Sequence, residues 1–474
     1  MSILSVLRKE PSDRETRGER RERTRWDNSA SLWRDTSRRL WFAPPATDID
    51  CDVAVVGAGF TGLWTALHLK QAAPTTDVVV LEALQPGFGG SGRNGGWCSA
   101  QFPVPEAALK ARFGGAAARA LRETLEDTVD MIGDFVGARG LTCGWNKSGT
   151  LNVAVNGPQW ARLREHARSA DGTTVLDADE LAGRVRVTGA LGASHDPRCA
   201  ALDPHALLDG LLDASIAAGV RIHGGTRVES VHREHLEART DAGLVFVTAR
   251  RTVVATEAYT TLLPKQRRRV VPVYSSVIAT DPLAPAVWGS IGWSGRETLS
   301  IAGHTVTYAQ RTADGRIVLG GRGSPYGFAS EIHSARDSHG RTHDNLERQL
   351  HSLFPETQGI RISHRWGGPV GIARDRMPTV WTDEGNGAVH AAGYAGDGVA
   401  LSHLAARVIT SLVLDTDDPA RALPLHGRRP PAWAPEPLRW VGLNAGIRLA
   451  GWADAREART GRRSRAAERL LAVR

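Results

Sequence analysis

Residues 51–62 read CDVAVVGAGFTG, and this stretch decides the fold. Its first half is a short apolar run that predicts a buried strand, and its second half is a glycine-rich turn. Residues 63–70 follow with the apolar spacing of a helix, and the run VVVLE at 78–82 predicts a second buried strand. The order strand, helix, strand predicts a parallel sheet that is covered on both faces.

The glycines of this turn, Gly57, Gly59 and Gly62, have the spacing G-x-G-x-x-G, and Glu82 follows 20 residues after the last of them. The first glycine allows a tight turn, the second lets the backbone approach a pyrophosphate, and the third lets helix and strand pack closely. An acid at the end of the second strand binds ribose hydroxyls. The pattern predicts dinucleotide binding, and a glycine-rich turn without a ligand is the alternative. The motif does not separate FAD from NAD.

A second glycine-rich loop, GGSGRNGGW at residues 89–97, lies just after that acid. Such a loop can wrap the middle of a long dinucleotide, with backbone N–H groups facing a phosphate or a flavin edge. An ordinary flexible loop is the alternative, and the Arg93-Asn94 pair between glycines disfavours it.

These stretches resemble those of the FAD-dependent amine and D-amino acid oxidases, a family that includes glycine oxidase and sarcosine oxidase. The likeness is closest to the γ-glutamylputrescine oxidase branch. It covers about residues 32–445 and continues in five later stretches, at 267–275, 311–323, 365–369, 393–399 and 436–440. The resemblance implies an α/β protein with a Rossmann-like FAD-binding domain and a discontinuous, mainly antiparallel β substrate domain of the α+β type, as in glycine and D-amino acid oxidases.

The resemblance also divides the chain into domains. The FAD-binding domain would comprise 51–105, 204–268 and 362–430, and the substrate domain would comprise 106–203 and 269–361. The remaining segments would be a disordered basic N-terminal extension at 1–31, a packing segment and linker at 32–50, and a C-terminal extension with a basic tail at 431–474. Hydrophobic spacing alone predicts helices at 105–137, 203–219, 343–354 and 399–412, and strands at 270–280, 315–321 and 388–392.

By the same resemblance the cofactor is FAD. The residues expected to bind it lie in the two glycine loops, at strand ends and at the start of the last helix: Gly57, Gly59, Phe60, Thr61, Gly62, Glu82, Ala83, Ser91, Arg93, Asn94, Gly95, Gly96, Arg227, Val228, Ala255, Gly396, Asp397, Gly398 and Val399. Relatives with covalent flavin use a Cys after the Trp-Gly-Gly strand or a His in the second glycine loop. Residues 366–381 contain no Cys and residues 87–99 contain no His, so noncovalent FAD is expected.

The resemblance also bears on the substrate. The amino-acid oxidases carry an Arg that binds the substrate α-carboxylate shortly after the position of Trp366, and Val370 stands there in this chain. An amine without an α-carboxylate therefore fits better. Tyr308, Tyr274 and Trp366 are the residues expected on the substrate face, and packing in the core is the alternative for each.

Three arginines, Arg311, Arg322 and Arg365, are candidates to hold a distal carboxylate such as that of a γ-glutamyl group. A surface ion pair is the commoner role for any one of them.

The expected reaction is hydride transfer from an amine to flavin, which gives an aldehyde plus ammonia or a smaller amine. Oxygen or another acceptor would then reoxidise the flavin. A D-amino acid, glycine or sarcosine type of oxidase or dehydrogenase is the alternative. A flavin monooxygenase is more remote, because Gly396-Asp397-Gly398 is not followed by Ala-His-Pro. The second glycine loop disfavours a plain NAD-dependent dehydrogenase.

Composition narrows the partners and the location. The net charge of +8 resides in the two ends, since residues 1–25 carry +3 and residues 456–474 carry +5. No nucleic-acid partner is therefore predicted. No apolar run approaches the ~18 residues of a membrane span, and no signal-peptide core is present. The four Cys form no C-x-x-C pair, so a cytoplasmic protein is expected.

One motif has the spacing of a metal site. His339 and His343 lie four residues apart, but no third ligand accompanies them and Gly340 argues against a rigid helix. An exposed polar turn is predicted there, and no metal site.

Overall fold

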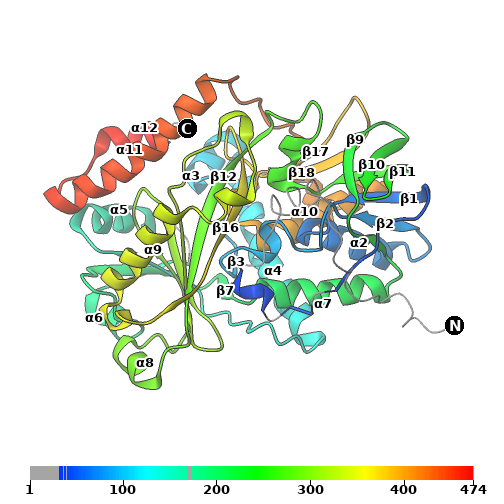
Figure 1. The fold of residues 1–474 in the computed structure, drawn as a ribbon. Coiled ribbons are helices and arrows are strands. Elements are labelled where there is room, and N and C mark those ends of the chain that lie inside the picture. Colours follow the sequence, from blue (N-terminus) through cyan, green and yellow to red (C-terminus); the bar gives the residue numbers. More distant parts are fainter. Residues whose placement is uncertain (1–30, 36, 39, 169–171, 473–474) are drawn as a thin grey trace.

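The computed structural model describes residues 31–472 apart from 36, 39 and 169–171. Two large sheets lie side by side, with helices packed around them (Figure 1). The disorder expected for 1–31 falls almost wholly outside the described residues. None of the described helices is long and apolar enough to cross a membrane.

The first sheet is the dinucleotide-binding sheet that the sequence predicts. Its strand order is β17 (Thr379–Thr382), β18 (Val389–Ala392), β11 (Gly243–Val254), β1 (Ile49–Val56), β2 (Val78–Leu81) and β8 (Arg221–His223). All neighbours pair in parallel except β17 and β18. The predicted strand-helix-strand unit is confirmed as β1, α2 (Phe60–Ala72) and β2.

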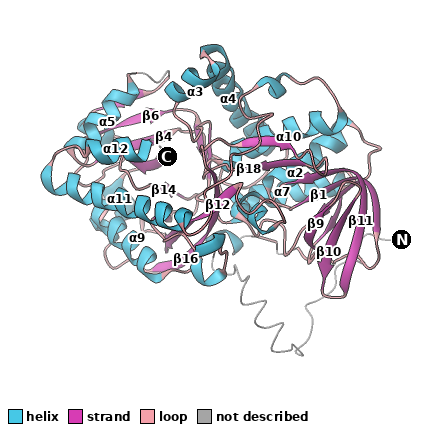
Figure 2. Cartoon of the chain, turned by 90° about the horizontal axis from the view of Figure 1, so that it is seen from above, coloured by secondary structure: helices cyan, strands magenta, loops and turns pink. Residues whose placement is uncertain are grey.

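Each face of this sheet has its own cover. Alternate residues of β1 and β2 pack against α2, α7 (Pro204–Ala217) and α10 (Gly398–Leu414). The other alternate residues pack against a meander of β9 (Arg227–Val231), β10 (His235–Thr240) and β11, which Figure 2 shows on the far side from the helices. Both faces of this sheet are therefore shielded from solvent, as expected for strands made of unbroken apolar runs.

The second sheet has the order β16 (Ile362–Ala373), β12 (Val270–Thr280), β15 (Ile317–Arg322), β14 (Thr307–Arg311), β13 (Thr298–Ile301), β4 (Thr150–Ala154), β6 (Gly192–Asp196) and β5 (Thr174–Leu176). Its pairs are antiparallel except β13 with β4. Because β16 pairs with β12, the segment 362–373 belongs to this sheet. The last piece of the first sheet therefore begins only at β17.

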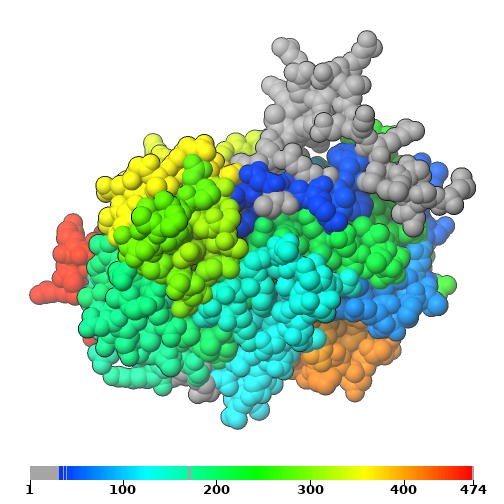
Figure 3. Space-filling model, turned by 90° about the horizontal axis from the view of Figure 1, so that it is seen from below, coloured from blue at the N-terminus to red at the C-terminus, as the bar shows by residue number. Residues whose placement is uncertain are grey.

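The remaining helices pack around these sheets: α3 (Glu106–Phe113), α4 (Gly115–Ala138), α5 (Gly157–Ala167), α6 (Ala178–Ala182), α8 (Pro285–Ile291), α9 (Gly340–Leu353), α11 (Leu438–Thr460) and α12 (Arg465–Ala472). The single helix predicted over 105–137 is two helices, because Gly114 between them has φ +87°. In Figure 3, α4 (cyan) lies at the centre of the lower face, with the teal strands and helices of the second sheet on one side of it. A short pair, β3 (Trp97–Ser99) with β7 (Cys199–Ala201), joins the second glycine loop to the rest of the chain.

The exposed polar turn predicted around His339 and His343 is wrong. Helix α9 begins at Gly340, and His343 is buried, with Nε2 2.8 Å from the carbonyl oxygen of Trp366. Burial lowers the pKa of this imidazole. The contact between the His343 ring and the Trp366 carbonyl oxygen anchors α9 onto β16, because a buried polar ring needs a hydrogen-bond partner.

Candidate active site

The first glycine turn has no room for side chains. Gly57 has φ +105°, a Cβ on Gly62 would lie 1.9 Å from the Gly57 carbonyl oxygen, and a Cβ on Gly59 would lie 2.8 Å from Ser91 Oγ. Ser91 Oγ also accepts the Phe60 N–H at 2.9 Å, so the two predicted glycine loops touch each other. This is the close approach of backbone to backbone that a pyrophosphate cradle needs.

Glu82 lies beside this turn at the end of β2. Its Oε2 accepts the Ala58 N–H at 2.8 Å and its Oε1 accepts the Leu84 N–H at 3.0 Å. Burial raises the pKa of Glu82, and these backbone N–H groups oppose the rise. Each carboxylate oxygen keeps acceptor capacity for a further hydroxyl. The residues present therefore fit the ribose and pyrophosphate of FAD.

The second glycine loop is held by side chains of β14. A Cβ on Gly95 would lie 2.2 Å from the ring of Tyr308, and a Cβ on Gly96 would lie 2.0 Å from Gln310 Nε2. Gln310 Nε2 donates to the Gly95 carbonyl oxygen at 2.8 Å. Asn94 fixes the loop internally, because its Oδ1 accepts the Gly96 N–H at 2.8 Å. The sequence analysis did not single out Gln310, since nothing local marks it.

Arg93 ties this loop to the second sheet. Its Nη1 donates to Asp337 Oδ2 at 2.7 Å and to the Gly367 carbonyl oxygen at 3.0 Å, and its Nη2 donates to Tyr259 OH at 2.7 Å. The ring of Phe88 lies against the guanidinium, 4.7 Å from its carbon. Burial raises the pKa of Asp337 to about 6, although Arg93 opposes the rise. The side chain expected to line the flavin is thus committed to holding the loop in place.

The late Gly396-Asp397-Gly398 loop opens α10, as predicted. Gly396 has φ +110°, and a Cβ there would lie 2.9 Å from Arg322 Nη2. Arg322 donates to the Ala395 carbonyl oxygen. Burial raises the pKa of Asp397 to about 7, and the opposing charge of Arg322 limits the rise. A carboxyl group that titrates near neutral pH therefore lies at the helix start.

Glu257 organises the same region, and the sequence analysis missed it. Its Oε2 accepts the Gly371 N–H at 2.7 Å, and its Oε1 accepts the N–H groups of Gly393 and Tyr394, each at 3.2 Å. Burial raises the pKa of Glu257. This carboxylate joins β16 to the turn that precedes Asp397.

The other predicted cofactor residues lie around the same groove. The Ala255 carbonyl oxygen would be 2.7 Å from a Cβ on Gly57, so Ala255 abuts the first turn. Arg227 and Val228 begin β9 in the meander. Thr61 Oγ1 lies 2.9 Å from Tyr394 OH. Ala83 is half-buried and lies just after β2. Val399 is buried in the first turn of α10.

A cavity of about 1550 Å³ opens beside these loops. Near the glycine loops its wall includes Asn94, Gly95, Trp97, Tyr308, Arg322, Val370 and Asp397. Farther out its wall is formed by the loop 303–306 and by α5, α9 and α11. Tyr308 OH lies 3.0 Å from Ser275 Oγ, and its ring meets Trp97 edge to face. Among the three predicted substrate-face residues, Tyr308 is the one that the described cavity wall includes.

Tyr274 and Trp366 are packed in the core. Tyr274 OH accepts the His333 N–H at 3.1 Å, and Trp366 Nε1 donates to the Arg93 carbonyl oxygen at 2.9 Å. Trp366 also meets Trp33 edge to face. Since neither is among the described residues that line the cavity, the expectation that they face substrate finds no support in the cavity wall.

The three arginines that are candidates to hold a distal carboxylate lie in different surroundings. Arg311 lies over the Trp288 ring at 3.9 Å and donates to backbone carbonyl groups. Arg365 forms ion pairs with Asp344 and Glu347. Arg322 alone of the three lines the cavity.

Comparison with known proteins places this site in a family. The family model for FAD-dependent oxidoreductases, DAO, matches residues 52–412. Gamma-glutamylputrescine oxidoreductase of Escherichia coli is 32% identical over 377 residues, which are 77% of this chain and 84% of that protein. A probable oxidoreductase, OrdL, of Haemophilus influenzae is 28% identical over 407 residues, 82% of this chain and 89% of that protein.

Solved structures agree on the fold. Glycine oxidase from Geobacillus kaustophilus superposes with a TM-score of 0.65 at 20% identity and covers 80% of this chain and 99% of its own. L-proline dehydrogenase from P. horikoshii superposes with a TM-score of 0.63 at 18% identity, over 79% and 96% of the two chains. The predicted fold class, with its glycine oxidase-like architecture, is confirmed. The chain belongs to the DAO family of FAD-dependent oxidoreductases.

Proposed function

We propose that this protein oxidises the C–N bond of an amine that lacks an α-carboxylate, with noncovalently bound FAD as cofactor. The observation that carries the proposal is the apolar side chain of Val370 on the cavity wall, at the position where the amino-acid oxidases carry their carboxylate-binding Arg. The name of the 32% identical E. coli relative supports a γ-glutamylputrescine-like amine as substrate.

The chain's own residues would hold FAD in an extended groove. The turn at 57–62 would face the pyrophosphate, Glu82 the ribose, and Arg227 and Val228 the adenine end. Backbone N–H groups of Asn94, Gly95, Gly398 and Val399 would face the flavin ring and stabilise negative charge there, whereas the N–H groups of Gly96 and Asp397 are already donated within the chain. Noncovalent binding follows from the absence of Cys in 366–381 and of His in 87–99.

FAD, when bound, supplies a hydride acceptor and passes the electrons to oxygen or to another acceptor. The protein would orient the amine against the cavity wall that Tyr308 and Trp97 form and exclude water from the reacting carbon. Loss of the hydride from carbon and of a proton from nitrogen gives an imine, which water hydrolyses to an aldehyde and ammonia or a smaller amine. Asp397 changes protonation near neutral pH, so its carboxyl oxygen is suited to hold the released proton.

Arg322 favours a second candidate, an oxidase or dehydrogenase of the glycine, sarcosine or D-amino acid type. Its guanidinium lines the cavity and interacts electrostatically with Asp397, and guanidinium groups bind carboxylates in bidentate fashion. An amino acid that placed its α-carboxylate on Arg322 would not need an Arg at position 370.

The experiment is an anaerobic comparison of substrates on the purified, FAD-loaded protein. γ-Glutamylputrescine is expected to bleach the oxidised flavin rapidly, whereas glycine, sarcosine and D-alanine are expected to bleach it slowly or not at all. Rapid bleaching by an amino acid alone would replace the first candidate with the second. Bleaching by NADPH would instead indicate a flavin monooxygenase. The cytoplasmic location stays a prediction, which cell fractionation would test.

A further inference from the structure

One face of α11 forms an outer wall of the cavity. Five of its lining residues recur every four positions, as Gly442, Gly446, Ala450, Asp454 and Ala458. Four of these five are glycine or alanine, so this strip of the helix leaves more space than the larger lining residues beside it, Leu443, Ile447 and Arg448. The helix begins 26 residues after residue 412, where the family match ends.

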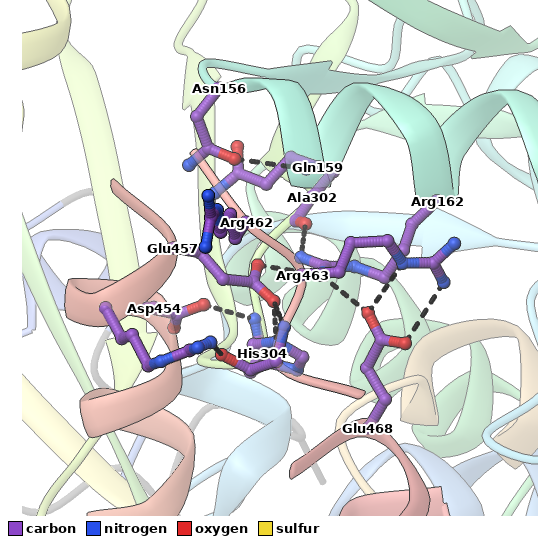
Figure 4. Close-up of polar contacts among 12 residues, drawn as sticks. Asn156, Gln159, Arg162, Ala302, His304, Asp454, Glu457, Arg462, Arg463 and Glu468 are labelled. Carbon is purple, nitrogen blue, oxygen red and sulfur yellow. Dashed lines mark hydrogen bonds and ion pairs between the residues drawn. The ribbon is translucent and has the colours of Figure 1, made fainter. Parts of the chain in front are cut away.

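A buried carboxylate fixes the far end of this helix to the second sheet. Glu457 is 0% exposed and accepts from Arg162 Nη1 at 2.7 Å and from the Ser464 N–H at 2.8 Å, while His304 Nε2 lies 3.1 Å from its Oε1 (Figure 4). Burial opposes ionisation of Glu457, but these contacts outweigh it and lower the pKa. Arg162 also donates to the Ala302 carbonyl oxygen at 3.1 Å, so α5, the loop after β13 and α11 meet at one point.

Asp454 makes the second attachment. Its Oδ1 accepts the His304 N–H at 2.7 Å and its Oδ2 accepts the Thr305 N–H at 2.8 Å. The loop that it holds and the helix that carries it both line the cavity. The outer wall is therefore built and fixed in place, and Figure 3 shows its helix (red) as a projecting edge of the molecule.

The compartment beneath this wall carries uncompensated positive charge. Arg348 of α9 and Arg448 of α11 both line it, and neither forms an ion pair with a described residue. Asp454 is the acid on this part of the wall, and each of its oxygens accepts one backbone N–H, so two guanidinium groups face one carboxylate and the balance is positive. A negatively charged group that entered the compartment would meet the guanidinium of Arg448, which has no hydrogen-bond partner among the described residues. It would also meet Arg348, whose guanidinium already donates to the Asp344 carbonyl oxygen and to Asn345 Oδ1.

We propose that the compartment beneath α11 is a subsite for the distal, anionic part of an extended amine, with Arg448 and Arg348 contacting its negative charge. The proposal rests on the proposed function, whose chemistry takes place at the opposite end of the cavity. The cavity of about 1550 Å³ includes the space beside the glycine loops where the flavin ring would lie, and its wall continues from there to α9 and α11, so room for a distal substrate part lies beyond the reacting end.

Two kinds of variant test the subsite. Gly442→Leu and Gly451→Leu fill it, because a Cβ at either position meets no atom within 4 Å, and leucine favours the helix more than glycine does. Arg448→Gln removes its charge. Ala445→Leu is the matched control, because Ala445 is exposed on α11 and is not among the described residues that line the cavity.

The substrate test compares γ-glutamylputrescine with N-butyrylputrescine, which keeps the acyl chain as far as the α-carbon but lacks the α-amino and α-carboxylate groups. Arg448→Gln is expected to raise the KM for γ-glutamylputrescine about tenfold, because it removes one charge-assisted hydrogen bond to the substrate. The kcat should not change. The KM for N-butyrylputrescine should not change. The filling variants should raise the KM for both amines. If Gly442→Leu, Gly451→Leu and Arg448→Gln all had the same KM values as Ala445→Leu for both amines, the subsite would be overturned.

Collisional quenching of the bound flavin's fluorescence separates this proposal from the proposed function, because it needs no substrate. The filling variants are expected to reduce quenching by neutral acrylamide and by iodide, whereas Arg448→Gln should reduce quenching by iodide alone. If neither amine reduces the native enzyme but the quenching changes follow this pattern, the proposed function fails and the positively charged, anion-binding compartment stands. If the amines are oxidised but neither KM nor quenching changes in the variants, the subsite fails and the function stands.

Discussion

Replacing Arg93 with Met tests what holds the second glycine loop in place. The substitution introduces an unbranched, apolar side chain and removes four donated hydrogen bonds, to Asp337, Gly367, Tyr259 and Gly89. The Arg93 side chain is 2% exposed and that of Asp337 is 15% exposed, so water cannot simply replace the guanidinium. Asp337 would be left as a buried carboxylate without its cation.

Removing one partner of a buried ion pair costs about 3–5 kcal/mol of the free energy of unfolding. The loss of unfolding free energy should depend on pH, because protonation of Asp337 removes the buried charge that lacks a partner. Its pKa in the folded state, about 6, already lies above the unfolded value, so stability is lost as pH rises through about 6. Without Arg93 this pKa rises further, and Arg93→Met should destabilise the protein less at pH 5 than at pH 8.

Urea unfolding of the FAD-loaded protein, followed by circular dichroism and flavin fluorescence, measures this loss. Arg221→Met is the control, since the Arg221–Asp77 pair is 44% and 43% exposed and should contribute only ~0–1 kcal/mol. Adding Asp337→Asn to Arg93→Met should recover part of the lost stability at pH 8. The reasoning is refuted if Arg93→Met is no less stable than Arg221→Met, or if the double variant gains nothing.

Three further predictions concern the cofactor groove. Gly62→Ala should abolish FAD binding, because its Cβ would lie 1.9 Å from the Gly57 carbonyl oxygen, whereas Gly90→Ala, with open space around its Cβ, should bind normally; the flavin-to-protein absorbance ratio reports both. Asp397→Asn should gain thermal stability relative to the native protein as pH rises from about 4 to 7, because the folded-state pKa of Asp397 is raised to about 7; equal melting temperatures across that range would contradict this. Glu257→Gln should lower the free energy of unfolding by about 1–3 kcal/mol, because an amide oxygen replaces only part of a carboxylate that accepts three backbone N–H groups; an unchanged urea midpoint would count against this role.

The dinucleotide-binding half of the fold could be predicted because its signals are local. Strand β1, helix α2 and strand β2 follow one another within 49–81, and Glu82 comes directly after them. Each apolar run there is buried on both sides, so the pattern has one consistent solution. The boundary at 362 could not be placed this way, because β16 reads as a strand of either sheet and only its pairing with β12 assigns it.

The supports of the site could not be predicted, because their partners are distant in sequence. Arg93 and Asp337 are 244 residues apart, and Glu257 lies 114 residues from Gly371. His343 likewise has a hydrogen-bond partner that its neighbours in the sequence do not indicate. Its neighbours are polar and suggested an exposed turn, but the fold places a backbone carbonyl of β16 within hydrogen-bond distance of its ring.

Tyr274 and Trp366 show what a resemblance leaves open. The resemblance predicts both on the substrate face, with packing in the core as the alternative. Each satisfies its polar tip with a backbone group, which lets the ring pack in the core, so the alternative has the support of these contacts. Tyr308 differs because it packs directly on Gly95, next to the predicted flavin position.

Anaerobic mixing of the purified protein with γ-glutamylputrescine tests the central claim most directly. The account predicts a yellow protein that releases FAD on denaturation, loses its oxidised-flavin absorbance within the mixing experiment, and yields one equivalent of aldehyde per flavin. A colourless protein that takes up no added FAD would contradict the account at its foundation. A yellow protein that no amine reduces would contradict the proposed reaction while leaving the family assignment intact.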